Sequence, residues 1–286
     1  MWTSSSTKIS ATTLWVTLAL LVPITLAACG GGNNNHPPDA PPPDAVPDAP
    51  PDASAPLTIL AAGASEGAIT DEAAVFTTKT GLSYTFTIQS ATALQTSITS
   101  GTIQPDVVVV TPAVITAIND FVLADSNVNL GQIGGGLAVR AGDPRPAIDT
   151  VAAFTDTLTQ ADVWYYSTGT AGKAFEKIVT TLNLTDQLAG KQNVLAGGKD
   201  AMLALAADTT HLHPIAVSQL SEIVSVPAVQ YVGPYPGNLQ TTTVYSAIIL
   251  KSSKRCPDAQ KLLQFFLGTE FQARLAASGF TPYTAP

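Results

Sequence analysis

Apolar and polar positions are arranged along the chain in blocks that predict strands followed by helices. Short apolar runs, such as residues 57–62 and 105–112, have the length of strands that are buried in a sheet. A turn rich in small and hydroxyl-bearing residues follows each run, and residues 69–82 then carry apolar side chains at helical spacing. The sequence therefore predicts an α/β fold with largely parallel sheets flanked by helices.

Two extended segments predict that the chain crosses twice between two lobes. Residues 132–142 are extended and rich in glycine, and residues 240–250 alternate as a strand that returns to the first lobe. We therefore expect one lobe from residues 57–140 together with 241–286, and a second lobe from residues 141–240. The cleft between two such lobes is a common place for a small ligand.

The turns that follow the predicted strands carry uncharged hydrogen-bonding side chains where helices begin. The N-terminus of a helix has free backbone N–H groups and a partial positive charge, so it can hold an anion or another acceptor. We nominate these side chains as ligand donors: Ser65, Ser90 and Thr92 in the first lobe, and Ser167, Thr168, Thr170 and Gln219 in the second. The alternative is that the Ser and Thr residues only cap helices.

The N-terminal segment predicts an export signal and a tether rather than part of the fold. Residues 14–26 form an apolar run of 13 residues, which is too short to favour a membrane span. The sequence Leu26-Ala-Ala-Cys29 resembles the cleavage motif of bacterial lipoproteins. Residues 1–28 are therefore predicted to be a signal peptide, Cys29 the lipidation site, and residues 29–56, rich in Pro, Asp and Ala, a disordered tether.

The N-terminal signal indicates where the protein is located, and the net charge limits its partners. We expect the protein in the periplasm or cell envelope, anchored to a membrane through Cys29, and the resemblance to bacterial lipoproteins, with Gly30 rather than Asp after the cysteine, implies the outer membrane. The formal net charge is −8 and the sequence has no cluster of basic residues. An acidic chain of this kind argues against nucleic acid as a partner.

The strand-end turns together resemble a known family. Their order and spacing are similar to those of molybdate-binding-type solute-binding proteins of ABC importers, in residues 57–67, 88–94, 106–112, 169–173, 218–223 and 243–247. The resemblance implies a type 2 periplasmic binding protein fold, in which two lobes joined by two crossover strands close on a small ligand. It also implies an ABC permease as a partner, a monomer, no cofactor and no enzymatic activity.

The resemblance completes the set of candidate ligand-binding residues, which are Ala64, Ser65, Ser90, Ala91, Thr92, Ser167, Thr168, Thr170, Ser218 and Gln219. The ligands of the family are oxyanions, so a molybdate- or tungstate-like oxyanion is favoured. Glu66 lies beside the first turn, and its charge would repel an oxyanion. A small organic acid or a neutral solute therefore stays an alternative ligand, and a ligand-sensing lipoprotein stays an alternative role.

A second class of function comes from the first turn itself. The sequence Gly63-Ala-Ser-Glu-Gly67 matches G-x-S-x-G, the turn that presents the nucleophile of many hydrolases. Ser65 would then be the nucleophile, with Asp200 or Asp208 as the acid and His211 or His213 as the base. Against this, the turn follows the first strand, so no earlier strand supplies the usual oxyanion-hole N–H. The two histidines also have the spacing of a shared metal face, but with Asp208 as the only nearby carboxylate we predict no metal site.

Overall fold

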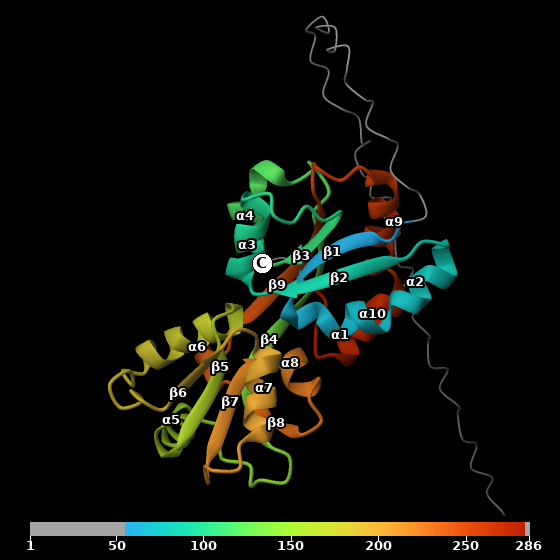
Figure 1. Cartoon of the computed structure of the whole chain (residues 1–286). Helices are drawn as coiled ribbons and strands as arrows, with labels where there is room; N and C mark the ends of the chain where they lie inside the picture. The colour runs from blue at the N-terminus through green and yellow to red at the C-terminus, as the bar shows by residue number, and fades with distance from the viewer. Residues whose placement is uncertain (1–54, 284–286) are drawn as a thin grey trace, which may run out of the picture.

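A computed structural model describes residues 55–283 of the chain (Figure 1). The predicted signal peptide, the predicted lipidation site at Cys29 and nearly all of the predicted tether lie outside the described residues. Within residues 55–283, no helix combines the length and the apolar character that crossing a membrane requires.

A nine-stranded sheet forms the centre of the molecule, with the order β2-β1-β3-β9-β4-β7-β5-β6 and β8 paired to β4. One half, here called the first sheet region, contains β1 (Leu57–Ala62), β2 (Tyr84–Gln89), β3 (Val107–Val110), β9 (Thr242–Ile249) and the start of β4. The other half, the second sheet region, contains the end of β4, β5 (Val163–Ser167), β6 (Gln192–Leu195), β7 (Pro214–Gln219) and β8 (Val229–Pro234).

Strand β4 (Val128–Arg140) runs through both sheet regions. Its residues 128–134 pair with β9, whereas residues 135–140 pair with β7 and β8. The change of partners occurs at the glycine run that the sequence marked as a crossing. Residues 135–140, which the expected boundary assigns to the first lobe, thus belong to the second sheet region, and the lobe boundaries themselves stay a prediction.

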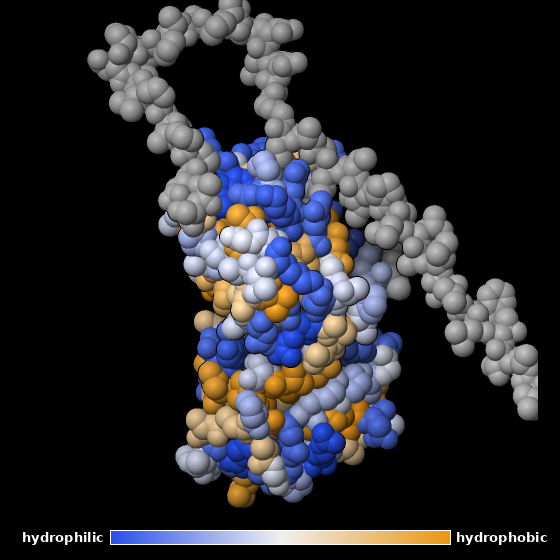
Figure 2. All heavy atoms as spheres, turned by 90° about the vertical axis from the view of Figure 1, so that its right-hand side faces the viewer, coloured by the Kyte–Doolittle hydropathy of each residue, from blue (hydrophilic) through white to orange (hydrophobic). Residues whose placement is uncertain are grey.

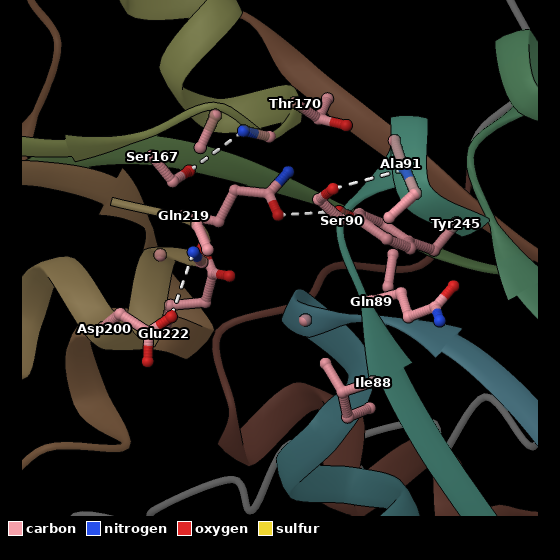
Figure 3. A pocket seen from close by; sticks show the side chains of 18 residues that line it. Ile88, Gln89, Ser90, Ala91, Ser167, Thr170, Asp200, Gln219, Glu222 and Tyr245 are labelled. Carbon is pink, nitrogen blue, oxygen red and sulfur yellow. Dashed lines mark hydrogen bonds between the residues drawn. The ribbon is translucent and has the colours of Figure 1, made fainter. Parts of the chain in front are cut away.

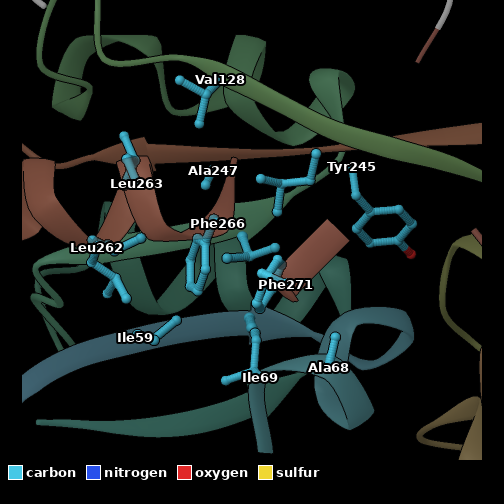
Figure 4. Packing of buried hydrophobic residues seen from close by; sticks show 14 of the residues in the cluster. Ile59, Ala68, Ile69, Val128, Tyr245, Ala247, Leu262, Leu263, Phe266 and Phe271 are labelled. Atoms are coloured by element: carbon cyan, nitrogen blue, oxygen red, sulfur yellow. The ribbon is translucent and has the colours of Figure 1, made fainter. Parts of the chain in front are cut away.

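Helices cover both faces of the first sheet region (Figure 1). One face carries α1 (Glu66–Asp71), α2 (Ala73–Thr80), α9 (Cys256–Phe266) and α10 (Thr269–Ala277), and the other carries α3 (Ala91–Thr99) and α4 (Pro112–Ala117). Strand β1 shows why both faces are buried, because Ile59 packs with the first group of helices and Leu60 with the second. Figure 4 shows the first of these cores, in which Phe266 and Phe271 pack over the sheet.

The second sheet region is layered in the same way. Helices α5 (Val151–Gln160) and α6 (Thr170–Thr181) cover one face, and α7 (Gly198–Ala207) and α8 (Leu220–Val224) cover the other. Along β5, Trp164 points to the first pair of helices and Tyr165 to the second, as the alternation of a strand requires. On the side of the molecule shown in Figure 2, apolar and polar residues are interspersed.

The structure confirms the α/β fold class and corrects two details of the sequence-based prediction. Half of the strand pairs are antiparallel, and each of those involves β4 or β9, because these strands run back between the two sheet regions. The helix expected over residues 69–82 breaks at Glu72 into α1 and α2. The remaining short helical turns are η1 (Gly63–Ser65), η2 (Asn119–Phe121) and η3 (Gly237–Leu239).

Candidate functional site

A cavity of about 280 Å³ lies between the two sheet regions, at the carboxyl ends of β1, β2, β5 and β7. Its polar side chains are Gln89, Ser90 and Tyr245 from the first region, and Ser167, Thr170, Asp200, Gln219 and Glu222 from the second. Figure 3 shows these side chains around one space. Ligands of open α/β sheets bind in such a crevice beyond the carboxyl ends of the strands.

Three helices begin at the wall of this cavity. The first residues of α3, α6 and α7, which are Ala91, Thr170 and Gly198, all line it. Their free N–H groups and helix dipoles make this side of the cavity favourable for negative charge. None of the described residues that line the cavity is Lys or Arg, so the helix N-termini are the source of positive potential in the wall.

The hydroxyl groups at the strand ends keep a donor for a ligand. Ser90 caps α3, because its Oγ accepts a hydrogen bond from the N–H of Ala93 at 3.4 Å. Ser167 Oγ likewise accepts from the N–H of Gly169 at 3.3 Å. A hydroxyl that accepts in this way can still donate its own proton. Capping and ligand binding are therefore compatible roles for these two serines.

Gln219 and Tyr245 join the two sheet regions across the cavity. The hydroxyl of Tyr245 on β9 donates to Oε1 of Gln219 on β7 at 2.8 Å (Figure 3). Gln219 is only 3% exposed, and its Nε2 has no hydrogen-bond partner among the described residues. A buried unpaired donor costs roughly 1–3 kcal/mol. An acceptor oxygen of a ligand in the cavity would remove this cost.

Two further contacts cross between the sheet regions beside the cavity. Lys199 Nζ on α7 pairs with Glu66 Oε1 on α1 at 2.8 Å. Lys173 Nζ on α6 donates to Thr92 Oγ1 on α3 at 3.4 Å. Both pairs are partly exposed, so each contributes little to stability on its own. They nevertheless show that the two regions meet in this conformation.

Glu222 is a buried carboxyl group in the wall of the cavity. It is 9% exposed, and its Oε2 accepts a hydrogen bond from Ser218 Oγ at 2.5 Å. Two glycines leave room for it, because a Cβ on Gly198 would lie 2.1 Å from Oε2 and a Cβ on Gly63 would lie 2.7 Å from Oε1. Burial raises the pKa of the Glu222 carboxyl, and the bond from Ser218 only partly offsets this.

This pKa shift gives a testable pH dependence of stability. A carboxyl group with a raised pKa in the folded state favours folding below its unfolded pKa of about 4.3 and loses this contribution as the pH rises through the folded pKa. Glu222→Gln removes the titration. The free energy of unfolding of the wild type should therefore fall relative to the variant between pH 4 and pH 8, as measured by urea denaturation. A difference that does not change with pH would contradict the shift.

The structure brings together five of the ten candidate residues, namely Ser90, Ala91, Ser167, Thr170 and Gln219. The other five do not line the cavity. Ala64 and Ser65 are buried in the first sheet region, and Ser218 lies beneath Glu222. Thr92 and Thr168 are exposed at its margin, where Thr168 donates to the carbonyl of Ala196 at 3.5 Å. Ligand contact by the five lining residues stays a prediction.

The geometry around Ser65 does not fit the hydrolase hypothesis. Ser65 is 1% exposed, and its hydroxyl donates to the carbonyl of Ala62 at 2.9 Å. His211 pairs with Asp208 at 2.8 Å just before β7 begins, whereas the cavity lies where β7 ends. A strand of this length spans roughly 17 Å. The serine therefore faces the protein interior, and the acid–base pair lies at the far end of a strand.

Glu222, Asp200 and Tyr245 are cavity residues that the sequence-based set missed. Asp200 is the third residue of α7 and accepts from the N–H of Gly197 at 3.1 Å, an ordinary capping arrangement. Glu222 had one signal in the sequence, since it is the acidic residue that follows the apolar strand β7 within a segment that is otherwise largely apolar. For Tyr245 the sequence signal was the apolar–polar alternation of the returning strand, and this alternation does not show which face of the strand lines the cavity.

The comparisons with known proteins agree with this architecture. The model of the family described as bacterial extracellular solute-binding protein matches residues 57–281. The periplasmic molybdate-binding protein of Azotobacter vinelandii has a TM-score of 0.67 at 18% identity, over 80% of this chain and 100% of that chain. The sulfate-binding protein of Mycobacterium tuberculosis has a TM-score of 0.63 at 14% identity, over 79% and 86%. These likenesses confirm the expected periplasmic binding protein fold.

One relative contradicts the expectation that the chain has no enzymatic activity. A Pseudomonas protein named aconitate isomerase is 28% identical over 165 residues, which is 57% of this chain and 62% of that protein. The chain thus covers less than two thirds of the relative's length. The expectation rested on a resemblance of strand-end turns, which describes a binding fold and leaves open what a side chain such as Glu222 does in the cavity.

Proposed function

Because the chain belongs to the family of bacterial extracellular solute-binding proteins, we propose that it binds a small organic acid in the cavity between its two sheet regions. The observation that carries the proposal is the buried Nε2 of Gln219, which has no hydrogen-bond partner within residues 55–283 and lies beside the N-termini of three helices. These groups are donors that suit one carboxylate of a ligand.

The choice of an organic acid over a molybdate-like oxyanion follows from the charges in the wall. Asp200 and Glu222 both line the cavity, and a fully deprotonated tetrahedral oxyanion would meet their carboxyl groups as well as the donors. An organic acid is more extended than a tetrahedral oxyanion, so it can place one carboxylate at the helix N-termini and a CH₂ group beside Glu222. The volume of about 280 Å³ is near the lower end of ligand pockets, which favours a small metabolite.

The proposed biological role is capture of this acid outside the cytoplasm for an ABC permease. Ligand contacts from both sheet regions would favour closure of the two regions on the ligand. We propose that the protein acts as a monomer and is held at the cell envelope through a lipid on Cys29. Labelling of cells with a radioactive fatty acid, with Cys29→Ala as the control, tests the anchor.

A thermal-shift panel tests the ligand class. The protein is heated with citrate, malate, succinate, cis-aconitate or trans-aconitate, and separately with molybdate, tungstate or sulfate. A ligand at 100 times its Kd stabilises the folded state by roughly 2.7 kcal/mol. We expect at least one organic acid to raise Tm and the oxyanions to leave it unchanged. A rise with molybdate or tungstate and none with the acids would refute the proposal.

A second candidate function is isomerisation of an unsaturated organic acid. The name of the Pseudomonas relative favours it, and so does the buried Glu222 carboxyl in the cavity, because moving a double bond requires a group that takes and returns a proton. The test is incubation of the protein with trans-aconitate and detection of cis-aconitate by proton NMR.

A further inference from the structure

We propose that Glu222 is the catalytic residue that removes a proton from an unsaturated organic acid in the cavity and returns it at a second carbon, while a polar cavity on its other side connects it to solvent. This inference rests on the isomerase candidate above. It assigns a catalytic role to a side chain for which the binding fold by itself requires none.

Glu222 and Gly63 form a wall that is shared by two cavities. On one side is the ligand cavity, and on the other is a cavity of about 370 Å³ between α1, α8 and α10. We call this second space the rear cavity. Its lining includes Glu66, Lys199, Ser221 and Arg274 together with Gly63 and Glu222 themselves. The carboxyl group of Glu222 is therefore in reach of a ligand on one side and of water on the other.

The local contacts hold the Glu222 carboxyl in one position. Ser218 donates to Oε2 at 2.5 Å, and the backbone N–H groups of Gln219 and Gly198 also donate to the carboxyl group. A proton-transfer group must be held in this way to act efficiently. Burial also raises its pKa, which brings a carboxyl group nearer to the range in which it both accepts and donates a proton at neutral pH.

Charged and titratable groups from four other elements, α1, α7, β9 and α10, face the surroundings of Glu222. Glu66 on α1 repels the carboxylate and helps to raise its pKa, and Glu66 is itself paired with Lys199 on α7 at 2.8 Å. Asp200 on α7 and Tyr245 on β9 face the ligand cavity. Burial raises the pKa of the Tyr245 hydroxyl, so Tyr245 stays a neutral donor. Arg274 on α10 faces the rear cavity, where Asp71 is its ion-pair partner.

The proposed step is a proton shift that needs no second reactant. A carboxylate oxygen of Glu222 takes a proton from a CH₂ group that lies between a carboxylate and a C=C bond. The electron pair of that C–H bond forms a new C=C bond to the neighbouring carbon. The electron pair of the old double bond takes the proton back from Glu222 at the far carbon, so Glu222 ends as a carboxylate again.

Negative charge builds on a ligand carboxylate during this step. The N-termini of α3 and α6 and the Nε2 of Gln219 lie where such a carboxylate is proposed to bind. Fixed donors of this kind stabilise charge that develops in a transition state. The two ends of the cavity would then have separate roles, one holding the charge and the other moving the proton.

The rear cavity predicts that solvent water can exchange its protons with Glu222. Ser221 is 7% exposed, lines the rear cavity, and its Oγ has no hydrogen-bond partner among the described residues. A polar space of this size can hold water, and water there would exchange the proton that Glu222 carries. In D₂O, some of the isomerised product should therefore contain deuterium.

The experiment follows trans-aconitate with the full-length protein in D₂O by proton NMR. We expect the wild type to form cis-aconitate with partial deuterium incorporation. Glu222→Gln should be at least 100-fold slower, within the usual range of about 10²–10⁴ for general acid–base catalysis, while trans-aconitate still raises its Tm. Glu270→Gln is the matched control, because Glu270 on α10 pairs with Lys79 at 2.5 Å and lines neither cavity.

A second variant covers the case in which Glu222→Gln does not fold. Ser218→Ala removes the donor that stabilises the Glu222 carboxylate, so the acidic limb of the pH–rate profile should move to higher pH. Wild-type rates in Glu222→Gln would overturn the catalytic role. Binding of trans-aconitate without any isomerisation by the wild type would also overturn it, and would leave organic acid binding intact. If no organic acid binds, the proposed function itself fails.

Discussion

Gly198→Ala should lower the free energy of unfolding by about 1–3 kcal/mol, the usual cost of forcing an extra methyl group into a packed site. The new Cβ would lie 2.1 Å from Glu222 Oε2 and 2.2 Å from Ser218 Oγ. The Glu222 carboxyl cannot turn away freely, because hydrogen bonds from Ser218 and from backbone N–H groups hold it in place. The variant should therefore also displace the side chain that we place at the proton-transfer position. Urea denaturation measures the loss.

Two further variants isolate the cause of this loss. In the double variant Gly198→Ala/Glu222→Ala the clashing carboxyl group is absent, so the two changes should be strongly non-additive, as expected for residues in contact. Gly67→Ala is the matched control, because the nearest atom to its new Cβ is 4.0 Å away. That change should stabilise α1 by roughly 0.5–1 kcal/mol. Simple additivity in the double variant would contradict the proposed clash.

The positions of the buried strands along the chain could be predicted, because a strand that is buried on both faces is apolar along its whole length. The run Val107–Val110 has no polar residue, since Val107 and Val108 enter different cores. The direction of the strands was less accessible. Whether β9 runs parallel or antiparallel to β3 depends on where the chain returns from the second sheet region, and no local pattern in residues 240–250 records that.

The residues that line the cavity were predicted in part, and the differences have a physical explanation. Ser90 and Thr170 could be found because a hydroxyl at the end of a strand and the start of a helix lies at the edge where ligands bind. Ser65 fulfils the same sequence rule, but its backbone is already helical, with φ −91° and ψ −5°. The side chain therefore bonds back to Ala62. Whether a serine faces the cavity or the core thus depends on whether it precedes the helical turn, as Ser90 does, or already lies within it, as Ser65 does.

Glu222 shows a different limit of sequence reasoning. A glutamate at the start of a helix is ordinarily exposed and favourable for the helix dipole. Its burial results from two glycines far away in the sequence, Gly63 and Gly198, which leave the space that the carboxyl group occupies. Only the assembled structure brings these three residues together, so the sequence alone does not show that this carboxyl group is buried in the wall of the cavity.

Phe175→Ala should destabilise the fold more than Gly198→Ala does. Phe175 is fully buried on α6, with its ring centroid 5.2 Å from that of Trp164 and 5.9 Å from that of Tyr166. Removing a buried phenylalanine side chain typically costs about 3–5 kcal/mol, since the cavity that remains does not collapse fully. For a domain of this size the corresponding fall in Tm is roughly 6–20 °C.

The same change should weaken ligand binding through α6. Thr170 and Ala171 in the first turn of α6 line the ligand cavity, and Phe175 lies just over one turn further along the helix, where it fixes α6 against β5. Loss of that contact loosens the helix N-terminus that the proposed carboxylate needs, so the Tm rise produced by an organic acid should shrink as well. Phe121→Ala is the matched control, because Phe121 is 39% exposed and lines neither cavity, and it should change Tm and ligand response only slightly. Equal losses in the two variants, followed by thermal denaturation with and without the acid, would show that the aromatic core of the second sheet region does not support the site.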